Sequence, residues 1–337
     1  MTPPPRCWVL SDGKPGMENQ CLGLAEALGI EPTIKRIAPR FPYSILPPQL
    51  WLAPLLAPGP AGDPLSEPWP ELLISSGRQA VAPAIAIKRA NRDATFTVQI
   101  QNPGVDPGRF DLVAVPAHDR LSGDNVIATF GALHRVTPGR LVREAARFRD
   151  RLAGLPRPLV AVLVGGTNRQ YRMSQACAER LARGLVRLGA DSGAGFAVTT
   201  SRRTGTANEA TLREHLAPVP SVIWDGAGEN PYFGYLALAD AIVVTGDSVS
   251  MVSEACATGK PVYVFDLEGG SKKFDRFHDK LRDRGITRRC DGTLAEGQYQ
   301  PPDDTSRVAD EVRRRFGHAG LRQTDATPGP KGPSGPN

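Results

Sequence analysis

Short, wholly apolar runs alternate along the chain with segments of helical periodicity. Runs such as 159–164 (LVAVLV) and 241–245 (AIVVT) are apolar at successive rather than alternate positions, which is typical of strands in a parallel sheet covered on both faces. Between such runs, a turn containing glycine leads into a segment whose apolar residues recur every three or four positions, which predicts a helix. The pattern therefore predicts an α/β protein.

The runs form two successive series of strand, turn and helix. In the first half we expect strands at 7–11, 33–37, 72–75, 95–100, 111–115 and 126–129, and helices at 19–28, 79–90 and 138–152. In the second half we expect strands at 159–164, 195–200, 221–224, 241–245 and 261–265, and helices at 174–188, 206–216, 231–238 and 249–258. Two such series predict two Rossmann-like domains facing each other across a cleft.

The expected domain boundary is the Pro-rich stretch at 155–158. It separates a first domain of residues 1–154 from a second of residues 155–303. An amphipathic helix at 304–316 is expected to return to the first domain. The tail, residues 317–337, ends TPGPKGPSGPN and is expected to be disordered.

Composition narrows the class of protein. With 40% hydrophobic and 23% charged residues in 337, the chain can bury ordinary cores. It has neither a run of about 20 apolar residues nor a secretory leader pattern, so we expect no membrane span and a cytoplasmic location. The five scattered cysteines predict reduced thiols, without a zinc site or disulfide framework.

The net charge of +6 is carried mostly by arginine, which makes up 33 of the 41 basic residues. Arginine suits phosphate and carboxylate groups, although a GC-rich genome would enrich it equally, and we favour that explanation. The basic residues are spread along the chain rather than gathered in a stripe. We therefore expect no nucleic-acid partner.

Four loops of the second half follow strands, where open parallel sheets bind ligands beside helix N-termini. The pair Gly165-Gly166 lets backbone amides approach a diphosphate, but a plain tight turn fits equally well. Adjacent arginines at 202–203 suit an anion or are solvated surface charge. The loop 224–232 can hold a nucleobase, while Trp224 is equally at home in a core.

The fourth loop, 245–255, is the most specific. Ser248 and Ser250 lie at a helix N-terminus that can bind phosphate, although Ser248 can also simply cap the helix. Glu254 stands in an otherwise small and apolar helix, where a carboxylate suits ribose hydroxyls. The candidate residues of the second half are Gly165, Gly166, Thr167, Arg169, Ser201, Arg202, Arg203, Asp225, Asn230, Asp247, Ser248, Ser250 and Glu254.

The first half holds candidates for a general base. Asp12 and Glu18 lie in or beside the turn after the first strand, where Asp12 can equally be a turn former. His118, in a strand-end His-Asp pair, is a third candidate. Further polar residues on the same side are Lys14, Gln20, Ser76, Gly77 and Arg78. The only Asp-Asp pair lies near the C-terminal end, at 303–304, so we expect no metal site.

The segment 44–58 is apolar but interrupted by prolines. Its large side chains are Leu46, Leu50, Trp51, Leu52, Leu55 and Leu56. We favour packing into the core of the first domain. The alternative is an exposed patch that contacts a membrane through Leu50, Trp51, Leu52 and Leu55.

An ordered series of motifs runs through nearly the whole chain, from about residue 7 to about 316. They are SDGKPGMENQCLGLAEALG, LLISSGRQA, FDLVAVPAHD, GALHRVTP, TTSRRT, DGAGENPY and GDSVSMVSEACATGKPVYVF. Together they closely resemble the mitochondrial-fission ELM-type family, whose second half is similar to GT-B glycosyltransferases. Met17 departs from the pattern, because relatives can carry a polar residue there.

The resemblance implies a GT-B-like fold with a nucleotide-sugar donor on the second domain. Glu254 would then lie near the ribose, and the loops at Gly165, Ser201 and Asp225 would hold the donor. The acceptor and the base would come from the first domain.

Taken together, these features predict a metal-independent, inverting glycosyltransferase. It would need no cofactor beyond its nucleotide-sugar co-substrate, and its acceptor would be a cell-envelope or lipid-linked molecule at the inner face of a membrane. The alternatives are a nucleotide-sugar epimerase and a non-catalytic, membrane-associated adaptor on a degenerate scaffold.

Overall fold

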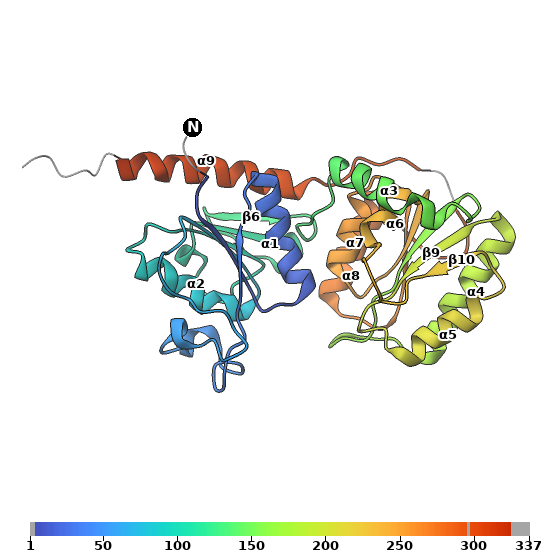
Figure 1. Ribbon diagram of the computed structural model, residues 1–337, viewed down its shortest axis with the longest axis horizontal. Helices are drawn as coiled ribbons and strands as arrows, with labels where there is room; N and C mark the ends of the chain where they lie inside the picture. Colours follow the sequence, from blue (N-terminus) through green and yellow to red (C-terminus); the bar gives the residue numbers. More distant parts are fainter. Residues whose placement is uncertain (1–3, 295–296, 325–337) are drawn as a thin grey trace, which may run out of the picture. The chain divides into compact units, whose positions relative to one another are not determined.

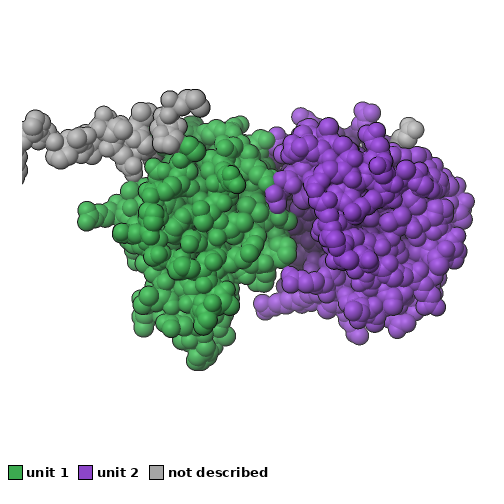
Figure 2. All heavy atoms as spheres, viewed as in Figure 1, with its two compact units in different colours: residues 1–114, 122–127, 305–337 green, residues 115–121, 128–304 purple. Residues whose placement is uncertain are grey.

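The computed structural model describes residues 4–294 and 297–324. It divides into two compact units, coloured green and purple in Figure 2. Unit 1 comprises Met1–Ala114, Ser122–Ile127 and Thr305–Asn337, and unit 2 comprises Val115–Leu121 and Ala128–Asp304. Each unit is built on one parallel sheet with helices packed against it (Figure 1). The predicted α/β class with two Rossmann-like halves is therefore confirmed.

Unit 1 contains a six-stranded sheet of order β2-β1-β3-β4-β5-β6. Its strands are β1 (Cys7–Ser11), β2 (Thr33–Arg36), β3 (Leu72–Ser76), β4 (Phe96–Ile100), β5 (Leu112–Pro116) and β6 (Val126–Thr129), and its first helices are α1 (Pro15–Leu28) and α2 (Arg78–Ala90). β1 lies between β2 and β3, with Val9 opposite Ile34 on one side and Ile74 on the other. No helix joins β2 to β3; that connection is a Pro-rich segment with two short 3-10 turns, Pro48–Leu50 and Pro54–Leu56.

Unit 2 contains the second six-stranded sheet, of order β10-β9-β7-β11-β12-β14. Its strands are β7 (Leu159–Leu163), β9 (Gly195–Thr199), β10 (Ser221–Ile223), β11 (Ala241–Thr245), β12 (Val262–Phe265) and β14 (Thr287–Arg289). The prediction that 261–265 is the last strand was wrong, because β14 pairs in parallel with β12 beyond it. The three-residue strand has only one buried residue, so its sequence lacks the apolar run by which the others are recognised.

Two apolar cores lie on the two faces of the unit 2 sheet. One includes residues of α4 (Gln175–Ser192) and α5 (Thr206–Leu216). The other includes residues of α3 (Pro138–Leu152), α6 (Tyr232–Leu238), α7 (Val249–Cys256) and α8 (Lys272–Asp283). A two-stranded antiparallel ribbon of β8 (Tyr171–Arg172) and β13 (Glu268–Gly269) completes the unit. The strands are buried on both sides, which explains their continuous apolar runs.

Helix α3 belongs to unit 2, whereas the expected boundary at 154/155 assigned it to the first domain. The physical reason is its contact with α6. A Cβ added at Gly234 would lie 2.5 Å from Cδ2 of Phe148, so the glycine allows the Phe148 ring to approach the α6 backbone. Phe148 is 1% exposed and anchors α3 there.

The last helix, α9 (Asp304–Thr324), returns to unit 1. The Phe316 ring packs edge-on against Phe96 at 5.7 Å, and Arg315 Nη2 donates to the Asp124 carbonyl oxygen at 2.8 Å. The helix continues past residue 316, so 317–324 are helical and were not the start of a disordered tail. The rest of the expected tail, 325–337, lies outside the described residues.

Substituting Gly234→Ala should lower the free energy of unfolding by about 1–3 kcal/mol, because the added methyl group forces Phe148 and α3 away from α6. Chemical denaturation of the full chain measures this. Gly184→Ala on α4 is the matched control, since its added Cβ would meet nothing within 4 Å and alanine favours helix. Equal stabilities for the two variants would contradict the proposed packing.

Candidate functional site

The carboxyl ends of β7, β9 and β11 are joined in unit 2 by one buried carboxylate. The side chain of Asp247 is 0% exposed and accepts hydrogen bonds from Gly166 N at 3.1 Å and Thr245 Oγ1 at 2.6 Å. Its third partner is the Arg203 guanidinium, with 2.8 Å between Nη1 and Oδ2. Asp247 was predicted as a donor-binding residue, and the structure has its carboxylate fully engaged with the protein.

The glycine pair after β7 is required by close packing. A Cβ at Gly165 would lie 2.2 Å from Asp247 Oδ1, and one at Gly166 would lie 2.0 Å from the Arg203 carbonyl oxygen. Gly166 also has a φ of 153°. Since any side chain would displace either Asp247 or the backbone at Arg203, the pair is needed to bring the two loops together.

Hydroxyl groups fix the loop after β9 to the glycine loop. Ser201 Oγ donates to the Gly165 carbonyl oxygen at 2.8 Å, and Thr204 Oγ1 donates to the same oxygen at 2.5 Å. Thr167 N in turn donates to the Arg203 carbonyl oxygen at 3.0 Å. Ser201 and Thr167, predicted as ligand-binding residues, thus have structural partners.

Two arginines at this edge remain available for an anion. Arg169 and Arg202 are exposed, and across residues 4–294 and 297–324 no ion pair is seen for either. They differ from Arg203, whose charge is compensated by Asp247. Because an arginine offers several donors in a planar fork, these two side chains are suited to phosphate oxygens.

The remaining predicted loop residues occupy turns and a helix cap. Asp225 Oδ1 accepts from Ala227 N at 2.9 Å, and Asn230 Oδ1 accepts from Tyr232 N at 3.0 Å. Ser248 is the N-cap of α7, accepting from Met251 N at 3.3 Å, and Ser250 lies half-buried in the first turn of that helix. The backbone amides of this first turn form the N-terminus of α7, and helix N-termini can bind phosphate.

Glu254 is buried, 5% exposed, on α7. Tyr232 donates its hydroxyl proton to Glu254 Oε2 at 2.6 Å. Burial raises the pKa of the Glu254 carboxyl to about 7, although the Tyr232 hydrogen bond and the charge of Arg135 act in the opposite direction. The carboxyl group of Glu254 therefore carries a proton in a large fraction of molecules near neutral pH.

An open hollow of about 600 Å³ lies beside the glycine loop. It is lined by Thr167, Asn168, Arg169 and the β8–β13 ribbon, with Arg172 and Glu268 at its wall. The hollow thus contains two of the predicted site residues, Thr167 and Arg169. Its volume is within the range of small-molecule sites.

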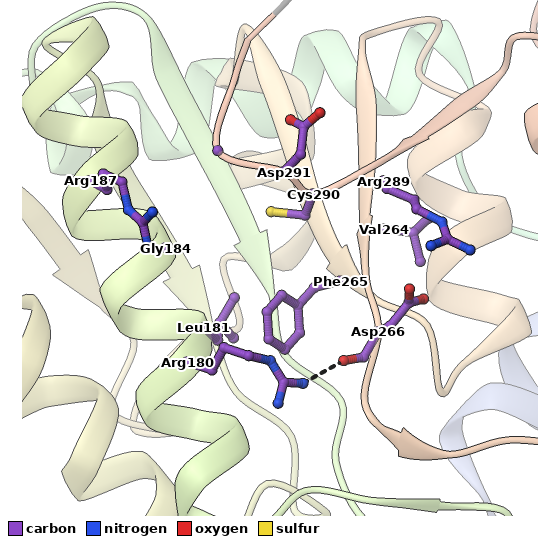
Figure 3. Close-up of a pocket in the computed structure, with 11 residues that line it drawn as sticks. Arg180, Leu181, Gly184, Arg187, Val264, Phe265, Asp266, Arg289, Cys290 and Asp291 are labelled. Carbon is purple, nitrogen blue, oxygen red and sulfur yellow. Dashed lines mark hydrogen bonds between the residues drawn. The ribbon is translucent and has the colours of Figure 1, made fainter.

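A second hollow, of about 390 Å³, lies between α4 and the ends of β12 and β14 (Figure 3). Arg180 stacks over the Phe265 ring at 5.1 Å and donates to the Asp266 carbonyl oxygen at 2.9 Å. Burial raises the pKa of the Cys290 thiol to about 11, so this thiol is protonated at neutral pH. The lining contains no predicted site residue.

The candidates of unit 1 are held mainly by neighbouring side chains. Glu18 accepts a bidentate pair of hydrogen bonds from Arg36, both at 2.9 Å. Asp12 pairs with Lys14, whose side chain is 69% exposed, and accepts from Lys14 N at 3.2 Å. This is the turn-forming role considered for Asp12.

The acceptor-side candidates of unit 1 are mostly buried. Gln20 is 2% exposed and donates to the Gly16 carbonyl oxygen at 2.9 Å. Ser76 is buried and donates to Met17 Sδ at 3.4 Å, while Gly77 is the N-cap of α2. Arg78, the first residue of α2, has an exposed side chain, as does Lys14.

His118 belongs to unit 2, on a 3-10 turn at Ala117–Asp119. Its ring packs edge-on against Phe277 of α8 at 5.6 Å, and Lys273 pairs with the adjacent Asp119. Burial lowers the pKa of His118 to about 4. The imidazole is therefore neutral at physiological pH and a weak proton acceptor.

Sequence reasoning missed three residues that organise this edge of the sheet. Tyr232 and Thr245 were quoted only as parts of loops, and Asn168, whose Nδ2 donates to the Asp247 carbonyl oxygen at 3.0 Å, was not singled out. A buried threonine two residues before a buried aspartate was the available signal for Thr245. Nothing in the spacing of Tyr232 and Glu254 indicates their contact, since it depends on how α6 and α7 pack.

The described helices include none long and apolar enough to cross a bilayer. Within the same residues there is no group of three or more His, Cys, Asp or Glu side chains that could hold a metal ion.

Comparison with known proteins identifies relatives along most of the chain. The profile of the family described as Mitochondrial fission ELM1 matches residues 15–316. A protein named Mitochondrial fission protein ELM1 from Arabidopsis thaliana is 34% identical over 278 residues, covering 74% of this chain and 65% of its own length. This chain therefore spans about two thirds of that plant relative. Uncharacterized protein RP120 from Rickettsia prowazekii is 24% identical over 351 residues, covering 91% of this chain and 97% of its own.

Solved structures share the fold at low sequence identity. UDP-GlcNAc 2-epimerase from Methanocaldococcus jannaschii, in complex with UDP-GlcNAc and UDP, superposes with a TM-score of 0.54 at 10% identity, covering 93% of this chain and 99% of its own. Os79 from O. sativa, in complex with U2F and trichothecene, superposes with a TM-score of 0.51 at 14% identity, covering 95% of this chain and 94% of its own. The architecture is therefore GT-B-like, as predicted.

The free energy of unfolding should fall by about 3 kcal/mol as the pH rises from about 4.5 to about 7, because of Glu254. Its pKa is raised from 4.5 to about 7 in the fold, so the folded state keeps a proton that the unfolded state has lost. Denaturation of the wild type and Glu254→Gln across this range measures the difference, and the variant should lack this part of the fall. Tyr232→Phe removes a hydrogen bond that favours the charged form of Glu254, so the pKa of Glu254 rises further. The stability of this variant should therefore keep falling to a higher pH than that of the wild type. Parallel profiles for all three proteins would contradict the assignment.

Proposed function

Since the chain belongs to the mitochondrial fission ELM1 family and has a GT-B-like scaffold, we propose that it binds a nucleotide sugar on unit 2 and transfers the sugar to an acceptor. The observation that carries the proposal is the cluster of loops at the carboxyl ends of β7, β9 and β11. Asp247 holds these loops together, while Arg169 and Arg202 remain exposed beside them. Sites of this kind in open parallel sheets bind phosphorylated ligands.

Each part of the proposed donor has a matching group in unit 2. Arg169 and Arg202 would pair with the diphosphate, and the first-turn amides of α7, near Ser250, would bind its oxygens. Glu254 would accept hydrogen bonds from the ribose hydroxyls, which would replace the hydrogen bond that it accepts from the Tyr232 hydroxyl. Side chains and helix dipoles would stabilise the leaving diphosphate, and we propose no metal or further cofactor.

Asp12 is the residue that we propose as the general base for an inverting transfer. Glu18 is held in a bidentate pair with Arg36, and the pKa of His118 is low for a base. Asp12 pairs with Lys14, whose side chain is 69% exposed, while the Asp12 side chain itself is 8% exposed. Lys14 would have to leave this pair for the carboxylate to take a proton from an acceptor hydroxyl. We propose a lipid-linked or cell-envelope acceptor.

The second candidate function is epimerisation of a nucleotide sugar. It is favoured by the superposition on UDP-GlcNAc 2-epimerase, with a TM-score of 0.54. Incubating the protein with UDP-GlcNAc and following the sugar by proton NMR separates the two reactions. An epimer without acceptor indicates epimerisation, whereas transfer releases UDP only when an acceptor is present. A non-catalytic adaptor would bind no nucleotide sugar at all.

Substituting Arg202→Ala should weaken binding of a UDP, GDP, ADP or dTDP sugar by about tenfold or more, because a charge-assisted contact to phosphate is lost. A thermal-shift panel identifies the nucleotide, and calorimetry then gives the dissociation constants. Arg149→Ala, an exposed arginine on α3, is the matched control and should bind as the wild type does. If no nucleotide raises the melting temperature of the wild type, the donor site does not exist.

If a donor is found, Asp12→Asn should abolish transfer while leaving donor affinity unchanged, since Asp12 lies in unit 1 and would act only on the acceptor. Measuring UDP release and donor binding on the same samples separates the two effects. Transfer at the wild-type rate by Asp12→Asn would exclude this residue as the base.

A further inference from the structure

The exposed apolar side chains of the protein are concentrated in one segment of unit 1. Among the described residues, six large apolar side chains are strongly exposed, and five of them lie between residues 41 and 56: Phe41 (77%), Ile45 (66%), Leu50 (55%), Leu52 (96%) and Leu56 (66%). The sixth, Val142, stands alone on α3. We call residues 37–62, the first part of the connection from β2 to β3 (residues 37–71), the lobe. In Figure 1 the lobe is the blue segment that projects below the sheet of unit 1.

The lobe is anchored to unit 1 by an aromatic pair. Trp51 is 7% exposed, its ring lies 5.1 Å from that of Tyr43, and it packs with Ala57 and with Ala82 of α2. Trp51 Nε1 also donates to the Leu46 carbonyl oxygen at 3.2 Å. Trp51 therefore belongs to the core, as the favoured interpretation of the sequence held, and Leu46 packs against the same cluster. For Leu50, Leu52 and Leu56 that interpretation was wrong, because the short turns leave these side chains exposed.

Some of the backbone amides beside the exposed side chains are already hydrogen-bonded within the lobe. The amides of Ile45, Leu50 and Leu56 donate within the lobe, to the carbonyl oxygens of Pro42 at 3.1 Å, Pro47 at 3.0 Å and Ala53 at 3.1 Å. The prolines of the segment have no N–H group to satisfy. Since unpaired amides are the main cost of placing backbone in lipid, this arrangement lowers the cost of insertion.

The charge of the lobe is also compatible with contact to a lipid surface. Residues 37–62 contain neither Asp nor Glu, and their only charged side chain is Arg40, which is exposed. The acidic residues of the connection, Asp63, Glu67 and Glu71, follow in its second part, where Asp63 Oδ2 accepts from Arg36 N at 2.7 Å. Within the lobe itself, an anionic headgroup layer would therefore meet one positive charge.

We propose that the lobe docks on a lipid bilayer, with Phe41, Leu52 and Leu56 entering the interfacial region. The exposed side chains come from, or lie between, successive short turns, at 41–45, Pro48–Leu50 and Pro54–Leu56, and a fluid surface takes up such spread apolar groups without needing a matching groove. The proposal goes beyond donor binding and does not depend on it, because the lobe lies in unit 1 and the donor candidates lie in unit 2.

Vesicle flotation of the full chain tests the proposal, using phosphatidylcholine vesicles with and without an equal part of phosphatidylglycerol. The wild type should float with both and better with the anionic mixture. The triple variant Phe41→Ser, Leu52→Ser, Leu56→Ser should partition at least about tenfold less, because three apolar groups no longer leave water. Val142→Ser is the matched control, since among the residues whose side chains the structure describes it removes the one large, strongly exposed apolar side chain outside the lobe; it should float as the wild type does.

Two further measurements make the result decisive. Leu52→Trp should show a blue-shifted emission, relative to the wild type, only when vesicles are added, because Leu52 is 96% exposed in water. Sedimentation without lipid should give the same mass for the wild type and the triple variant. Equal flotation of wild type and triple variant would overturn the proposal, and so would self-association that the triple variant loses, which would assign the lobe to a second copy of the chain. Nucleotide binding by the triple variant should be unchanged, so failure here and failure of the donor site are separable.

Discussion

The buried carboxylate of Asp247 is the interaction on which the candidate site depends. It sits among the carboxyl ends of three strands, where a charge without partners would be very costly, and receives a guanidinium, a hydroxyl and a backbone amide. Those partners come from the carboxyl ends of β7, β9 and β11, so the hydrogen bonds and the ion pair of this one carboxylate hold the three loops together. Removing the carboxylate would leave Arg203 partly buried and unpaired.

Because these loops are occupied with one another, the side chains at the edge divide into two groups. One group holds the loops together. Gly165 and Gly166 allow the loops to pack closely, and the hydroxyls of Ser201 and Thr204 donate to the Gly165 carbonyl oxygen. Arg169 and Arg202, by contrast, are exposed. This division explains why a site rich in hydrogen-bonding residues has few groups left for binding: most of its polarity is used in holding its shape.

The lobe of unit 1 likewise combines a buried side chain that fixes its position with side chains that stay exposed. A Rossmann-like half usually places a helix between consecutive parallel strands, but the prolines between β2 and β3 prevent one. The segment instead closes around Trp51, which uses one large aromatic side chain to anchor 3-10 turns too short to bury their own leucines. The outward-facing leucines are therefore a consequence of this geometry.

The α/β class and most of the elements could be predicted from the sequence, because continuous apolar runs and helical spacing are local signals. The strand ends that carry the candidate site could be located as well, since glycine turns after strands are local too. Four features became visible only in the folded chain: α3 joins unit 2 through Gly234, β14 extends the sheet, Tyr232 donates to Glu254, and Trp51 is buried while Leu52 is exposed. Each of these depends on a contact between residues distant in sequence, and the spacing along the chain carries no record of such contacts.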